Sequence, residues 1–167
     1  MNIVFARLTH ILRKLLNKLR FIICGRIKQD KYLTYGIKEA ILFPVTIDGF
    51  LRYADAVNKI LEDSTVHSIL EIGSGGPGIL RFLSSKRYNI TLLDVSRDVL
   101  LEVADKCANR IVANGCKLPF RGNSFGIVIS IAAFEHIPKH SCEAFIEEVK
   151  RVVRKKLILH FPVEFSS

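Results

Sequence analysis

The chain has 167 residues, 49% of them hydrophobic, and a formal net charge of +9. This length and composition exclude a disordered chain and fit one domain with a sizeable core plus an appendage. The charge is concentrated at one end, because residues 1–38 carry nine Lys or Arg and one acid, whereas residues 39–167 carry sixteen basic and fifteen acidic side chains. We therefore predict a basic arm over residues 1–44 and a nearly neutral folded domain over residues 45–167, so the basic isoelectric point says little about the ligand of that domain.

The first 24 residues predict an amphipathic helix whose polar face is basic. Apolar residues recur at helical spacing between Val4 and Ile23, and arginines and lysines fall between them. These charges exclude a membrane-spanning helix and a signal-peptide core. Three interpretations of residues 1–24 stay open: a helix on an anionic membrane surface, a helix packed on protein, and a basic arm on RNA. Nucleic acid is the least favoured, because no stacking aromatic residues are interleaved with the charges.

The cysteines bear on the cellular compartment. Cys24, Cys107, Cys116 and Cys142 form no CxxC pair and show no metal-ligand spacing with the five histidines. They predict reduced thiols, no metal site and a cytoplasmic protein. Peripheral association with a membrane is a further expectation, and it depends on the helix over residues 1–24.

A helix is predicted from Gly49 to Leu61, after a connector that ends near Pro44. Asp48 is its expected N-cap, and its apolar side is expected to cover one face of a sheet. That apolar side consists of Phe50, Leu51, Ala54, Val57, Ile60 and Leu61.

Residues 68–83, SILEIGSGGPGILRFL, predict a buried strand over Ser68–Ile72, a turn, and a helix that begins at Pro77. Four of the six residues from Gly73 to Gly78 are glycines. Glycine permits positive φ and lets a ligand approach the backbone closely, and a helix N-terminus offers unpaired N–H donors. The pattern predicts a site for a nucleotide-like ligand, and the alternative is an ordinary strand-to-helix turn without a ligand. The expected apolar side of this helix consists of Ile79, Leu80, Phe82 and Leu83.

A second apolar strand is predicted over Asn89–Leu93, and Asp94 follows it. An acid at the end of the second strand of such a unit can accept hydrogen bonds from ribose hydroxyls, although a helix-capping or loop aspartate is the alternative. Ser96 is the expected N-cap of the next helix. The expected buried side of that helix consists of Leu100, Leu101, Val103, Ala104 and Cys107.

Three more strands are predicted over Arg110–Ala113, Ile127–Ile131 and Lys156–Phe161. Between the last two, Ser141 caps a predicted helix that ends near Val153. Strands that alternate with helices predict an α/β domain with a doubly wound, mostly parallel sheet of about five strands.

The spacing Gly73-x-Gly75-x-x-Gly78 alone also fits a dinucleotide fingerprint, so a nicotinamide-dependent oxidoreductase stays open on that evidence. Four further blocks bear on the choice: Leu118-Pro119-Phe120, Asn123-Ser124-Phe125, Val128-x-Ser130 and Glu135-His136-Ile137-Pro138. Together with the glycine turn and Asp94, they resemble class I S-adenosylmethionine-dependent methyltransferases of the type 11, small-molecule kind. The resemblance extends from Ser68 to about Pro162, and it implies a Rossmann-like fold and S-adenosylmethionine as the cofactor.

The resemblance implies a role for each matching position. Glu71 and the glycine turn would cradle the methionine part of the cofactor, Asp94 would hold the ribose hydroxyls, and Val95 would pack on the adenine. Glu135 and His136 would lie where the acceptor enters, which makes them weak candidates for a general base, with a structural role as the alternative. The implied cofactor residues are Glu71, Gly73, Ser74, Gly75, Gly76, Gly78, Asp94, Val95, Asn114, Gly115, Cys116, Ser130 and Ile131.

The sequence departs from the family pattern at three places. Asn114 replaces an acid that meets the adenine amino group, a hydrogen bond that an amide carbonyl can also accept. Gly126 replaces an aspartate, which predicts weaker anchoring of the preceding loop. The family continues beyond the fifth strand, whereas this sequence ends at Ser167, so the apolar strand 157–161 would be an exposed edge. We therefore expect either a partner chain that covers this edge or a C-terminally shortened form.

The resulting prediction is a methyltransferase that acts on a small-molecule or lipid-like acceptor, with the membrane surface as an open choice for where it acts. A truncated, non-catalytic module of the same fold and a nicotinamide-binding oxidoreductase are the alternatives.

Overall fold

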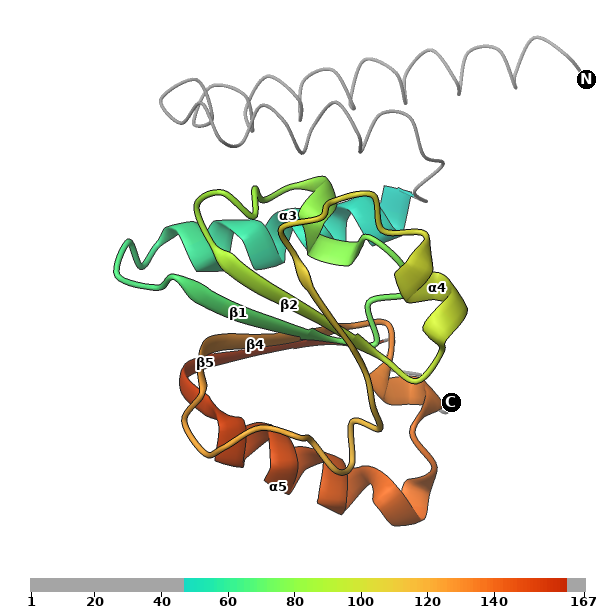
Figure 1. Ribbon diagram of the computed structural model, residues 1–167. Helices are drawn as coiled ribbons and strands as arrows, with labels where there is room; N and C mark the ends of the chain where they lie inside the picture. The colour runs from blue at the N-terminus through green and yellow to red at the C-terminus, as the bar shows by residue number, and fades with distance from the viewer. Residues whose placement is uncertain (1–46, 162–167) are drawn as a thin grey trace, which may run out of the picture.

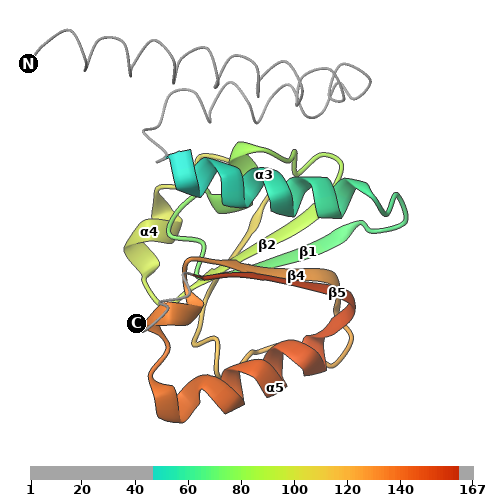
Figure 2. The same ribbon diagram turned by 180° about the vertical axis from the view of Figure 1, so that it is seen from behind.

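Five parallel strands form one sheet in the order β3-β2-β1-β4-β5. The structure, a computed structural model, describes residues 47–161. Figure 1 shows α3 on one face of the sheet and α5 on the other, and Figure 2 shows the same two layers from behind. The strands are β1 (Ser68–Ile72), β2 (Asn89–Asp94), β3 (Asn109–Val112), β4 (Phe125–Ile131) and β5 (Val153–His160). The helices are α3 (Ile47–Leu61), α4 (Arg97–Leu101) and α5 (Cys142–Val152), with short 3-10 helices η1 (Gly78–Arg81), η2 (Phe134–His136) and η3 (Lys139–Ser141).

The core consists of two apolar layers, one on each face of the sheet. On the α3 face, the side chains of Tyr53, Ala56, Val57 and Ile60 are buried at the spacing of one helical stripe. On the α5 face, Phe145, Val149 and Val152 repeat this pattern. Because both faces are covered, all seven residues of β4 are buried, and the prediction of a parallel, doubly wound sheet is confirmed.

The strand order places the change of direction at β1, which pairs with β2 on one side and β4 on the other. The connections after β1 and after β4 therefore leave the sheet toward opposite sides. Ligands of open α/β sheets bind at this point, beside the carboxyl ends of the strands. The fold thus directs attention to the segments that follow β1, β2 and β4.

Several predicted element bounds need correction. The segment after the glycine turn forms only the 3-10 helix Gly78–Arg81, not a longer α-helix. Helix α3 begins at Ile47, so Asp48 lies inside the helix and is not its N-cap. Strand β5 begins at Val153, three residues before the predicted start.

The predicted buried side of α4 is also partly wrong. The helix ends at Leu101, whose side chain is 64% exposed, and the exposed Ala104 and Cys107 follow it. Leu100 and Val103 are buried as predicted. Ser96 is the N-cap residue but makes no side-chain capping bond. The predicted apolar stripe is partly wrong because a helix of five residues is too short to hold all its members on one face.

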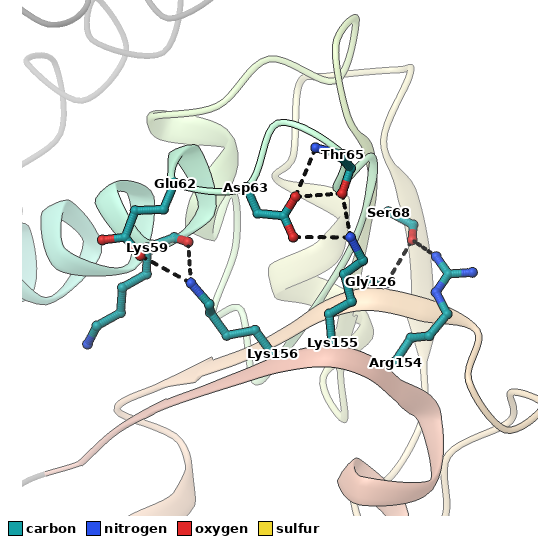
Figure 3. Close-up of polar contacts among 9 residues, drawn as sticks. All are labelled: Lys59, Glu62, Asp63, Thr65, Ser68, Gly126, Arg154, Lys155 and Lys156. Atoms are coloured by element: carbon teal, nitrogen blue, oxygen red, sulfur yellow. Dashed lines mark hydrogen bonds and ion pairs between the residues drawn. The ribbon is translucent and has the colours of Figure 1, made fainter.

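A β-bulge interrupts the pairing of β4 and β5 near the amino ends of the two strands. Phe125 pairs with Val153 and Ile127 pairs with Lys156, so two residues of β5 lie opposite Gly126. Figure 3 shows the result: Lys155 reaches Asp63 and Thr65 in the segment between α3 and β1. Lys156 reaches the Lys59 carbonyl in the last turn of α3 and Glu62 just after it. Consecutive side chains of a regular strand would point to opposite faces.

The sequence predicted weak anchoring of the loop before Gly126, but other hydrogen bonds hold this region in place. Its N–H donates to the Ser68 hydroxyl at 2.8 Å, and a Cβ at this position would lie 3.2 Å from Val66. The loop that precedes it is bound to α5, since the Arg151 guanidinium donates to the carbonyls of Leu118 and Phe120. The loop is therefore held without the aspartate of the family pattern.

The predicted basic helix and connector, residues 1–44, lie outside the described residues. Among the helices of residues 47–161, none has the length and apolarity to cross a membrane. Strand β5 forms one edge of the sheet and pairs with β4 alone among the described strands.

Candidate functional site

The turn between β1 and η1 is built from glycines that other residues cannot replace without strain. Gly73, Gly75, Gly76 and Gly78 have φ values of 71°, 56°, 116° and 46°, all in the left-handed region. Two of them are also closely packed. A Cβ at Gly73 would lie 2.3 Å from the Ala133 Cβ, and one at Gly78 would lie 2.1 Å from Glu71 Oε2. The turn therefore depends on glycine for both its backbone conformation and its contacts.

Glu71 supports this turn from below. Its side chain is fully buried, its Oε2 accepts the Ile79 N–H at 2.7 Å, and its Oε1 accepts the Tyr53 hydroxyl at 2.8 Å. Burial raises the pKa of Glu71 to about 7, and Asp94 adds to the rise, while the Ile79 N–H, the Tyr53 hydroxyl and Arg81 oppose it. The carboxyl group therefore titrates near neutral pH and holds the first residues of η1 in place.

Asp94 connects the end of β2 to the same turn. Its Oδ2 accepts the Gly75 N–H at 3.0 Å and its Oδ1 accepts the Ser96 N–H at 2.9 Å. A carboxylate offers about four acceptor sites, so both oxygens retain capacity for a further donor such as a hydroxyl. Val95, the next residue, is 70% exposed, which leaves an apolar side chain beside the turn for a ring to pack on.

The segment after β3 presents an exposed amide beside two partly or fully buried residues. Asn114 Oδ1 accepts the Cys116 N–H at 2.8 Å, so part of the acceptor capacity predicted for adenine is used within the loop. Gly115 is buried, and a Cβ there would lie 2.9 Å from Phe145. Cys116 is half-buried, and burial together with Cys142 raises the pKa of its thiol. Gly115 thus places the loop tightly on the α5 layer, while Asn114 faces outward.

The end of β4 folds back onto the glycine turn. Ala132 has φ of 53°, which is uncommon for a residue with a Cβ, and its N–H donates to the His160 carbonyl at 2.8 Å. This bend places Ala133 against Gly73. The carboxyl ends of β1, β4 and β5 are thereby joined at one place.

The structure brings several of the predicted cofactor residues together at one end of the sheet, and two others occupy the end of β4. Glu71, the glycines, Asp94 and Val95 lie at one end of β1 and β2. Ile131 packs in the α3-face core, so the side chain of Ser130, its neighbour along β4, projects toward the α5 face. Ser74 and Ser130 are buried, and neither hydroxyl finds a hydrogen-bond partner among the described residues.

Glu135 and His136, the weak candidates for a general base, lie in η2 with exposed side chains. Neither side chain forms a hydrogen bond or ion pair with another residue in the described range 47–161. Nothing in this geometry activates either group for proton transfer.

Sequence reasoning missed three contributors to the site. Tyr53 looks like one more apolar position of α3, and no spacing in the sequence connects it to Glu71. Ala133 belongs to no sequence motif from which its contact with Gly73 could be predicted. His160 Nε2 lies 2.8 Å from Asp55 Oδ2, a carboxylate oxygen that also accepts Lys59 Nζ at 2.6 Å, and this contact joins the end of β5 to α3. Only the fold brings these residues together.

Comparison with known proteins decides the family. A family model described as a methyltransferase domain matches residues 70–161, more than half of the chain. The chain belongs to this methyltransferase-domain family. The resemblance to class I S-adenosylmethionine-dependent methyltransferases is thereby confirmed, and S-adenosylmethionine is the cofactor that membership implies. No curated protein matches the sequence.

Solved structures share the fold of this methyltransferase domain. A Pyrococcus horikoshii protein matches with a TM-score of 0.55 and 20% identity, over 65% of this chain and 50% of that one. A phosphoethanolamine N-methyltransferase 2 from Haemonchus contortus, in complex with phosphomonomethylethanolamine and S-adenosylhomocysteine, matches with a TM-score of 0.56 and 21% identity, over 66% and 28%. An S-adenosylmethionine-dependent methyltransferase from Aquifex aeolicus matches with a TM-score of 0.52 and 20% identity, over 66% of each chain.

The methyltransferase domain described here spans 45% to 50% of the length of the first four of these solved structures. The matches give no support to the nicotinamide-dependent alternative.

Proposed function

We propose that this chain binds S-adenosylmethionine at the glycine turn and transfers its methyl group to a small-molecule or lipid-like acceptor. The observation that carries the proposal is the hydrogen bond between the Asp94 carboxylate and the Gly75 N–H, because it joins the ribose-binding acid to the turn. In the proposed complex, Asp94 accepts from the ribose hydroxyls, Val95 packs on the adenine and the glycine turn contacts the methionine part. Asn114, Gly115 and Cys116 line the adenine end, and Ser74, Ser130 and Ile131 complete the pocket wall.

The residues present fit this cofactor. The positive-φ glycines leave no side chain between the backbone and a ligand, and the Asp94 oxygens retain acceptor capacity. The buried Ser74 hydroxyl, unpaired among the described residues, lies in the same turn. S-adenosylmethionine supplies an activated methyl group on a sulfonium. The chain's own part is to hold the acceptor in line with that group and to exclude water.

The acceptor chemistry is proposed from the family alone. The Haemonchus contortus protein carries a phosphorylated amine, which supports a small polar acceptor or a lipid headgroup. A proton must leave the acceptor when the new bond forms, and Glu135 and His136 stay weak candidates to receive it.

Four further expectations stay predictions. They are the membrane-surface helix over residues 1–24, the domain boundary at 44/45, the cytoplasmic location, and a partner chain on the 157–161 edge.

Asp94→Asn is expected to weaken binding of S-adenosylmethionine by roughly 10- to 100-fold, because a hydrogen bond to a charged acceptor contributes about 1.5–3 kcal/mol. Isothermal titration calorimetry with the full chain measures the loss. Asp63→Asn is the matched control, since Asp63 lies at the opposite end of the sheet and contacts Thr65 and Lys155 (Figure 3). Equal affinities for Asp94→Asn and the wild type would remove Asp94 from the proposed site.

A further inference from the structure

Glu71 is the one buried carboxylate among residues 52–161, and it lies directly under the glycine turn. It projects from β1 to the α3 face, whose buried layer includes the apolar side chains of Ile69, Ile79 and Phe82. A buried carboxylate is unfavourable unless it is hydrogen-bonded. Each of its oxygens has one such bond, and the two donors come from different elements: α3 supplies Tyr53, and η1 supplies the Ile79 N–H.

Tyr53 contacts both the carboxylate and the segment that follows the turn. Its hydroxyl lies 2.8 Å from Glu71 Oε1, and its ring stacks on the Phe82 ring with a centroid distance of 5.3 Å and an interplanar angle of 17°. Tyr53 is itself buried, so the hydroxyl is shielded from water. Its donation therefore stabilises the ionised form of Glu71 more than an exposed hydroxyl would.

The other charged groups that face Glu71 are few. Arg81 of η1 favours its ionised form and Asp94 of β2 opposes it, while burial disfavours the charge. These effects leave the carboxyl group close to balance at neutral pH, so one hydrogen bond has a large influence on its charge. Removing the Tyr53 hydroxyl would move the balance toward the neutral acid.

The charge matters because the two forms of the proposed cofactor differ by one positive charge. S-adenosylmethionine carries a sulfonium, and S-adenosylhomocysteine carries a neutral thioether in its place. We propose that Tyr53 is a positioning residue for the glycine turn, acting through Glu71, whose buried negative charge favours the sulfonium ligand over the neutral thioether. This inference rests on the proposed function, because it assumes that the turn holds the methionine part. Its consequence is that ionisation of Glu71 promotes exchange of product for cofactor.

The test compares the affinities of the two ligands by calorimetry at about pH 6 and about pH 7.5, on either side of the Glu71 titration. In the wild type, the preference for S-adenosylmethionine over S-adenosylhomocysteine is expected to rise about threefold or more with pH. Glu71→Gln reports the change that comes from ionisation of the ligands alone. Tyr53→Phe is expected to follow Glu71→Gln at both pH values, because its Glu71 stays largely protonated.

Tyr88→Phe is the matched control. Tyr88 is buried in the same apolar layer, and its hydroxyl forms no hydrogen bond with another described residue, so this variant is expected to follow the wild type. The inference is overturned if the wild type has the same pH dependence as Glu71→Gln, or if Tyr53→Phe follows the wild type.

A second readout separates this inference from the proposed function. Failure of both ligands to bind the wild type at millimolar concentration would overturn the proposed function and, with it, the preference for the sulfonium. The positioning of Glu71 by Tyr53 is then decided by thermal unfolding alone. Tyr53→Phe is expected to lower Tm more at about pH 8, where Glu71 is ionised, than at about pH 5. Equal losses of Tm at the two pH values would overturn it.

Discussion

Replacing Gly73 by alanine is expected to reduce the free energy of unfolding by about 3 kcal/mol or more and to abolish cofactor binding. Left-handed backbone in a residue with a Cβ contributes about 1–2 kcal/mol of this loss. The remainder comes from the new Cβ, which would lie 2.3 Å from the Ala133 Cβ and force β4 away from the turn. Urea denaturation of the full chain, followed by circular dichroism, measures the change.

Two variants separate the two causes of this loss. Gly75→Ala has the same backbone problem, with φ of 56°, but a Cβ there meets nothing within 4 Å, so a loss of only about 1 kcal/mol is expected. Adding Ala133→Gly to Gly73→Ala removes the clashing atom and is expected to recover part of the stability. If Gly73→Ala and Gly75→Ala lose the same stability, the contact between β4 and the turn has no energetic role.

Glu71→Gln is expected to change how stability depends on pH. The pKa of Glu71 is about 7 in the folded chain, above its ordinary value of 4.5, so the folded state binds the proton more tightly than the unfolded state. Stability from this group is therefore fully present below pH 4.5 and is lost as pH rises toward 7. The loss amounts to about 3 kcal/mol, at about 1.4 kcal/mol for each unit of pKa difference.

The glutamine variant lacks this titration, so its stability relative to the wild type is expected to rise by about 3 kcal/mol between pH 4.5 and pH 8. Urea denaturation across this range measures the difference, and other titrating groups cancel in the comparison. Glu147→Gln is the matched control, because Glu147 is exposed and, within residues 47–161, pairs with Lys150 alone on the surface of α5. Parallel pH profiles for Glu71→Gln and the wild type would mean that Glu71 is not perturbed in the folded chain.

Much of the fold could be predicted because local patterns and the required sheet agree. The apolar strands, the stripe of α5 and the glycine turn each specify one structure, and the parallel sheet follows from their alternation. The failures lie where local pattern is weak. Helix α4 carries a run of apolar residues, but it ends at Leu101, and the run continues into a loop in which Val103 is buried and Ala104 is exposed. The β-bulge in β5 opposite Gly126 was also not predicted, because the register between β4 and β5 is set by pairing across the sheet and not by a local pattern.

Of the candidate site, only the residues that belong to sequence motifs could be predicted. Gly73 and Asp94 belong to motifs in which the backbone itself requires the residue type, so spacing alone locates them. Tyr53 and Ala133 act through contacts across the sheet, and residue type alone does not distinguish them from core positions. The same holds for the pair of Asp55 and His160, which are 105 residues apart. Long-range contacts of this kind require the fold.

The central claim is that the glycine turn of this methyltransferase-family chain binds S-adenosylmethionine, and a titration followed by two-dimensional NMR tests it most directly. S-adenosylhomocysteine, added to the ¹⁵N-labelled full chain, is expected to shift the amide signals of Gly73 to Gly78 and of Asp94 and Val95, while those near Asp63 and Lys155 stay in place. NADH is expected to shift none of them. Shifts confined to other parts of the chain, or a response to NADH at the turn and none to S-adenosylhomocysteine, would contradict it.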